Sequence, residues 1–120
     1  MDETVDVQAV TIGVGTIAAV GLLGYHTVVS ESLFGYETTA LATGAFALTF
    51  LAVALLHGAY GRGDFALAHG LAGVGLLFVA IASTGPQVLV GMACLVAGGS
   101  YIAIKTVRAR REQREVRSTG

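Results

Sequence analysis

Two histidines, His57 and His69, are the residues whose type and spacing could support chemistry in this chain of 120 residues. Each lies near the end of a long apolar stretch: His57 comes three residues before Tyr60, and His69 comes four residues after Phe65. The connection between the stretches is short, so both imidazoles should lie about one helical turn from the same membrane boundary. A histidine inside an apolar span is a candidate for function by default.

Two neighbouring imidazoles could ligate the iron of a haem b or another metal ion, or they could relay a proton. The structural alternative, which we favour, makes His57 and His69 interfacial residues with one hydrated ring nitrogen each. Two nitrogens alone are an incomplete metal site, and a tight helical hairpin offers a haem little width. No acid, histidine and nucleophile share one depth in the spans. We therefore expect no cofactor, no metal and no enzymatic activity.

The composition points to a membrane as the solvent. Hydrophobic residues make up 54% of the chain, charged residues only 12%, and the mean hydropathy is +0.74, whereas soluble domains carry about 25% charged residues. Between Glu37 and Lys105 the only charged residues are Arg62 and Asp64. This pattern excludes disorder, nucleic-acid binding and an ordinary soluble core. The single cysteine, Cys94, excludes an intrachain disulfide.

Four apolar segments reach the length of about 20 residues that a helix needs to cross a bilayer. They predict an all-α fold, a four-helix membrane bundle running up-down-up-down, with spans at about 7–29, 38–60, 65–83 and 87–106. The membrane domain then covers residues 1–106, and residues 107–120 form a basic tail.

The breaks between the segments have turn chemistry. Gly61 suits a positive φ after the second helix, and Asp64 and Thr38 are predicted N-caps of the third and second helices. Pro86 suits the first turn of the fourth helix, where no backbone N–H is needed.

Basic residues predict the orientation, since short cytoplasmic loops carry the excess of Lys and Arg. Both termini and the Arg62 loop are therefore expected in the cytoplasm. Arginine outnumbers lysine six to one, beside abundant Ala, Gly and Val, which favours a prokaryotic plasma membrane. The basic segment 105–117 bears a net charge of +4. It is interpreted first as a topology signal and second as a contact for anionic lipid headgroups or an acidic partner. Its basic residues are Lys105, Arg108, Arg110, Arg111, Arg114 and Arg117.

Small residues predict close packing of the second helix on the third. In each helix a series steps by 4, 3, 4, 3 and 4 residues, the spacing of a left-handed helix pair. The two series mirror each other about Arg62, so that Leu51 should face Gly73. Ala93, Ala97 and Ser100 are candidates for the packing face of the fourth helix. The mirrored series are Ala40, Gly44, Ala47, Leu51, Ala54 and Gly58, and Ala66, Gly70, Gly73, Leu77, Ala80 and Thr84.

These features favour a non-enzymatic accessory or scaffold subunit that packs with itself or with a larger membrane complex. The alternatives are a minimal oligomeric channel or transporter, and a small b-type cytochrome that uses His57 and His69. In length and span number the chain is similar to the small multidrug resistance transporters and the four-span fluoride channels. It lacks the embedded Glu of the first family and has no Asn for the pore of the second, so we assign it to neither.

Overall fold

The protein folds into four long helices joined by short turns. The computed structural model describes the backbone of residues 3–120 and the side chains from Val7 onward. All four helices are long and apolar enough to cross a membrane, which confirms the all-α prediction. A short antiparallel hairpin, which the sequence did not predict, joins the first two helices. The elements are α1 (Glu3–Val28), β1 (Ser32–Leu33), β2 (Tyr36–Glu37), α2 (Thr38–Ala59), α3 (Gly63–Ala80) and α4 (Gly85–Thr119).

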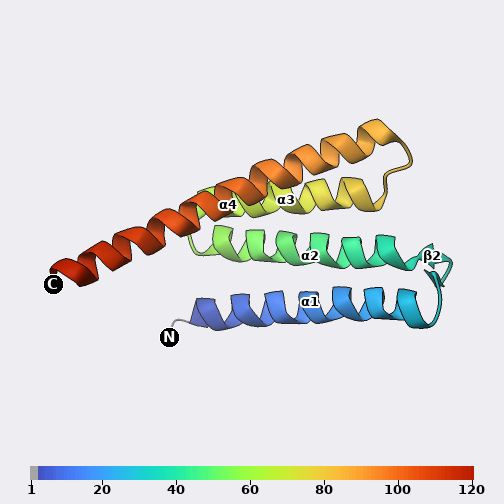
Figure 1. The fold of residues 1–120 in the computed structure, drawn as a ribbon, viewed down its shortest axis with the longest axis horizontal. Coiled ribbons are helices and arrows are strands. Elements are labelled where there is room, and N and C mark those ends of the chain that lie inside the picture. The colour runs from blue at the N-terminus through green and yellow to red at the C-terminus, as the bar shows by residue number, and fades with distance from the viewer. Residues whose placement is uncertain (1–2) are drawn as a thin grey trace.

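The helices lie side by side in chain order, and consecutive helices run in opposite directions (Figure 1). The extensive helix contacts are those of α1 with α2, α2 with α3 and α3 with α4. The bundle is therefore open, with α1 at one edge and α4 at the other. Since α4 has 35 residues, it is about 52 Å long at 1.5 Å per residue, and its C-terminal part extends past the ends of the other helices (Figure 1).

The predicted contact between α2 and α3 is present for the three residue pairs of the mirrored series that lie nearest the Arg62 turn. A Cβ added at Gly58 would lie 3.8 Å from Cβ of Ala66, and one at Gly70 would lie 3.9 Å from Cβ of Ala54. A Cβ at Gly73 would lie only 2.9 Å from the Leu51 side chain. The large residue therefore fills the space that the glycine leaves.

The predicted contact is wrong at the end of the two series that lies furthest from the Arg62 turn. Helix α3 ends at Ala80, three residues before the predicted end of the span, and Thr84 serves as the N-cap of α4. Thr84 therefore cannot continue the α3 face, and nothing lies within 4 Å of a Cβ at Gly44.

A second close contact, between α3 and α4, uses glycines that the sequence analysis did not assign. A Cβ at Gly75 would lie 2.5 Å from the carbonyl oxygen of Gly91, and one at Gly91 would lie 2.6 Å from that of Gly75. A Cβ at Gly98 would collide with the carbonyl oxygen of Ala68 and lie 2.9 Å from the backbone nitrogen of Ala72. The candidate face of Ala93, Ala97 and Ser100 is exposed instead, because Gly91 and Gly98 allow the backbones to approach on another side of α4.

The contact between α1 and α2 follows the same principle. A Cβ at Gly15 would collide with the hydroxyl of Thr49, and Ala19 is fully buried. The Thr49 hydroxyl donates to the carbonyl of Ala45 at 2.8 Å, so this polar group is satisfied within its own helix.

The turns agree with the sequence in part. Gly61 has φ 76° and Pro86 lies in the first turn of α4, as predicted. The two predicted caps are wrong. Arg62 and Glu37 occupy the N-cap positions of α3 and α2, and neither makes a side-chain cap bond. Asp64 lies in the first turn of α3 instead, where its charge still complements the helix dipole.

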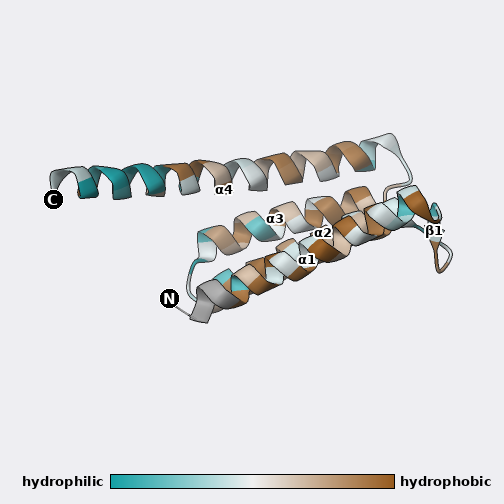
Figure 2. Cartoon of the chain, turned by 60° about the horizontal axis from the view of Figure 1, so that its bottom comes forward, coloured by the Kyte–Doolittle hydropathy of each residue, from teal (hydrophilic) through white to brown (hydrophobic). Residues whose placement is uncertain are grey.

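The outer surface of the helices is apolar along most of their length. Ile17, Leu55 and Leu67 are 75%, 76% and 77% exposed, and the longest hydrophilic stretch lies along the C-terminal part of α4 (Figure 2). So much exposed aliphatic surface is unfavourable in water but neutral against lipid chains.

We predict that Gly98→Leu destabilises the protein by about 1–3 kcal/mol, the usual cost of overpacking, because its side chain must push α4 away from α3. The matched control is Gly99→Leu, since a Cβ at Gly99 meets nothing within 4 Å. Unfolding of both variants in mixed micelles measures the difference. Equal losses at the two neighbouring positions would contradict the assignment of the α3–α4 contact.

Candidate functional site

The predicted histidine pair comes together at one end of the helix row. His57 in the last turn of α2 and His69 in α3 have ring centroids 4.9 Å apart, at an interplanar angle of 38°. The tight α2–α3 contact positions them, since His57 directly precedes Gly58 and His69 directly precedes Gly70. His57 is only 7% exposed, and His69 is half-buried.

Aromatic rings surround the pair. The ring centroid of Phe65 lies 5.4 Å from that of His57, and Phe50 lies 5.9 Å from His69. The guanidinium of Arg62 lies 4.4 Å from the centroid of the Phe65 ring, within the range of a cation–π interaction. The imidazoles are therefore held in a packed aromatic cluster with a cation at its rim.

Hydrogen bonds orient both rings. Nδ1 of His69 donates to the carbonyl oxygen of Phe65 at 2.8 Å, so neutral His69 carries its proton on Nδ1 and leaves Nε2 as an acceptor. Nε2 of Gln8 in α1 lies 3.4 Å from Nε2 of His57, and the amide N–H is the donor of that pair. Gln8 thereby ties α1 to the end of α2.

A pocket of about 290 Å³ opens beside the pair and is lined by residues of all four helices. Helix α4 reaches it because the helix continues beyond the ends of α2 and α3 (Figure 1). We call this space the terminal pocket. Its polar lining residues are Gln8, His57, Arg62, His69, Thr106, Arg110 and Gln113.

The predicted basic tail is helical, and its residues have different surroundings. Arg110 lines the terminal pocket, whereas Arg117 lines a neighbouring hollow along α4. Nζ of Lys105 lies 5.6 Å from the ring centroid of Tyr101, whose hydroxyl donates to Asp64 at 3.2 Å. Arg111 and Arg114 border a small recess on α4 itself. Arg108 lines neither the terminal pocket nor the neighbouring hollow.

The geometry does not fit a haem between the two histidines. A bis-histidine haem places its porphyrin plane between the ligand rings, but these rings are 4.9 Å apart and the helices touch one residue further on, at Gly58. Nor does the described part of the chain bring three or more His, Cys, Asp or Glu side chains together as a metal-binding group. The arrangement supports hydrogen bonding and charge recognition at the pocket.

Sequence reasoning missed Gln8, Arg62 and Gln113 as parts of this site. Gln8 could have been found, because it is an isolated polar residue in the first apolar segment, at the depth of the histidines. Gln113 could not, since its place depends on the direction in which α4 crosses the other helices. His26 lies near the opposite end of α1 and does not join the site.

Comparison with protein-family models, with curated proteins and with solved structures gives no match for this chain.

We predict that Gln8 and His57 are energetically coupled through their hydrogen bond. A double-mutant cycle of Gln8→Ala and His57→Ala should give a coupling of about 0.5–1.5 kcal/mol in the free energy of unfolding. A cycle of Gln8→Ala with Tyr101→Phe, which removes a hydroxyl bonded elsewhere, is the control and should be additive. Additivity in both cycles would show that the amide does not bond the imidazole.

Proposed function

We propose that the chain is a small multi-pass membrane protein that acts as a non-enzymatic accessory or scaffold subunit and packs with itself or with a larger membrane complex. The observation that carries this proposal is the open row of helices. Helices α1 and α4 each pack extensively on one neighbour only, so two apolar edges are available to other membrane helices. A closed bundle of the same helices would offer no such edges.

Small residues at both edges support association. Nothing lies within 4 Å of a Cβ at Gly13, Gly21 or Gly24 of α1, and Ala93 and Ala97 are exposed on α4. Close approach of backbones is the main source of affinity between helices in lipid. The same residues are of no benefit on a surface that contacts only lipid chains.

The interior of the row supports a structural role over transport. Between the two ends, the buried residues are small and apolar: Ala19, Ala47, Val53, Ala72 and Gly73. Within the described residues, the two buried polar side chains, Thr38 and His57, lie at opposite ends of α2, and the buried residues between them are apolar.

We further propose a plasma-membrane location with both termini in the cytoplasm. The support is that every Lys and Arg of the sequence belongs to the end that carries the Arg62 turn and the C-terminal part of α4. The N- and C-terminal ends of the ribbon lie toward this same end (Figure 1).

The orientation predicts the outcome of cysteine labelling in intact cells. In a Cys94→Ala background, Ser32→Cys should react with a membrane-impermeant maleimide from outside, because it lies on the hairpin between α1 and α2. Gly63→Cys should react only in inverted vesicles. Labelling of Gly63→Cys from outside would reverse the proposed orientation.

The scaffold proposal predicts self-association through the edges of the row. In mild detergent, light scattering corrected for bound detergent should show more than one chain per particle. Gly13→Leu and Ala97→Leu, one on each edge, should shift the population toward monomer, since Leu prevents close backbone approach. Leu55→Val, on the exposed face of α2, is the control. A monomer at all concentrations, or equal effects of all three variants, would contradict self-association.

A further inference from the structure

We propose that the terminal pocket binds a phosphate group, either as the headgroup of an anionic phospholipid or as part of a small soluble phosphate compound. This inference goes beyond the scaffold role, and the pocket itself carries it. The pocket brings together N–H donors from α1, the α2–α3 turn and α4: the guanidinium groups of Arg62 and Arg110, and the amides of Gln8 and Gln113. Arginine is suited to phosphate because its fork of N–H groups matches two oxygens at once.

The charge of the pocket favours an anion. No carboxylate is among the lining residues that the structure describes, from Val7 onward, whereas Arg62 and Arg110 each contribute a permanent positive charge. The guanidinium carbon of Arg62 lies over the Phe65 ring, 4.4 Å from its centroid. A cation–π contact of this kind uses no N–H group of the guanidinium as a hydrogen-bond donor to oxygen, so these groups can donate to an acceptor.

The hydrogen bonds of the histidines give the pocket a fixed wall. His69 is bonded to the carbonyl of Phe65 and His57 to Gln8, so both rings are oriented before a ligand binds. Preorganised groups bind more tightly because little side-chain entropy is lost on binding.

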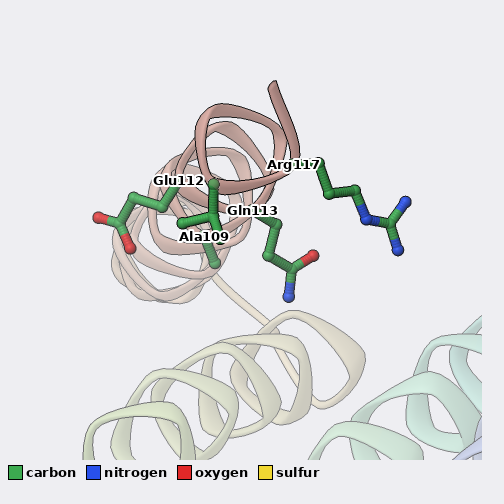
Figure 3. Close-up of a pocket in the computed structure, with 5 residues that line it drawn as sticks. Ala109, Glu112, Gln113 and Arg117 are labelled. Atoms are coloured by element: carbon green, nitrogen blue, oxygen red, sulfur yellow. The ribbon is translucent and has the colours of Figure 1, made fainter. Parts of the chain in front are cut away.

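The size of the pocket selects a small group. Its volume of about 290 Å³ lies just below the range of roughly 300–1,000 Å³ that is typical for drug-sized ligands. A neighbouring hollow lies along α4 and shares Ala109 and Gln113 with the terminal pocket. In Figure 3, Gln113 points from α4 toward the helices below, while Glu112 points sideways. The hollow leaves room for the rest of a molecule whose phosphate occupies the pocket.

The position of the pocket matches the depth of a lipid headgroup. It lies where α2 ends and α3 begins, and where α4 changes from apolar to charged residues (Figure 2). Basic residues at this depth attract anionic lipid headgroups. A pocket with two arginines adds a specific site to that general attraction.

The test uses the full chain in neutral maltoside micelles and three probes: dioleoylphosphatidylglycerol, dioleoylglycerol, which has no phosphate, and inorganic phosphate. Native mass spectrometry measures lipid binding, and calorimetry measures inorganic phosphate. The key variant is Arg110→Gln. Its matched control is Arg108→Gln, which removes the same charge from the same helix outside the pocket. Arg62→Lys, which keeps the charge and removes the fork, is a second variant in case Arg110→Gln does not fold.

We expect saturable binding of a phosphate probe, weakened about tenfold or more by Arg110→Gln through loss of charge-assisted hydrogen bonds. Arg108→Gln should weaken it only about twofold, since its charge acts through screened solvent. Binding of the phospholipid alone identifies a headgroup site, and saturable binding of inorganic phosphate identifies a site open to soluble compounds. Equal losses in the two variants, equal binding of dioleoylglycerol, or no saturable binding would overturn the proposal. The described lining residues of the pocket all belong to one chain, so binding is counted per chain, and its outcome remains separate from the tests of self-association and orientation.

Discussion

The close approach of α3 to both of its neighbours is the constraint on which the rest of the structure depends. One face of α3, with Gly70 and Gly73, contacts α2, and the face with Ala72 and Gly75 contacts α4. These faces are offset by two residues, which is roughly 200° around a helix at 3.6 residues per turn. Helices α2 and α4 must therefore lie on opposite sides of α3. This geometry produces an open row and prevents closure around a common centre.

The same constraint places the candidate site. Contact at Gly58 and Gly70 brings the preceding residues, His57 and His69, to one side of the hairpin. Contact at Gly91 and Gly98 fixes the direction of α4, and a helix of 35 residues then carries Arg110 to the pocket that His57 and His69 also line. The terminal pocket is thus a consequence of two backbone contacts and of the length of one helix.

Much of this could be predicted from the sequence, because the relevant signals are local or symmetric. The four helices follow from apolar segments of spanning length, and the α2–α3 contact follows from small residues that mirror each other about a short turn. The α3–α4 contact was missed because its residues on α3, Ala68, Ala72 and Gly75, alternate along the chain with the residues that face α2. The sequence alone does not show which neighbouring helix each set of small residues contacts. The type I′ hairpin was missed because its first central residue is Phe34, with φ 53°. A bulky residue is unusual at a positive φ.

The histidines at the two ends of the row have different surroundings. At one end, His57 and His69 lie among aromatic rings, and each has a hydrogen-bond partner that fixes one ring nitrogen. At the other end, Nδ1 of His26 is buried and has no hydrogen-bond partner among the described residues, and no arginine or lysine of the sequence lies nearby. Polar groups in a weakly polar environment have a high free energy unless they are paired. The paired histidines form a preorganised wall beside two cations, whereas His26 is an isolated group. The proposed anion site is therefore assigned to the end where the chain brings oriented donors and positive charge together.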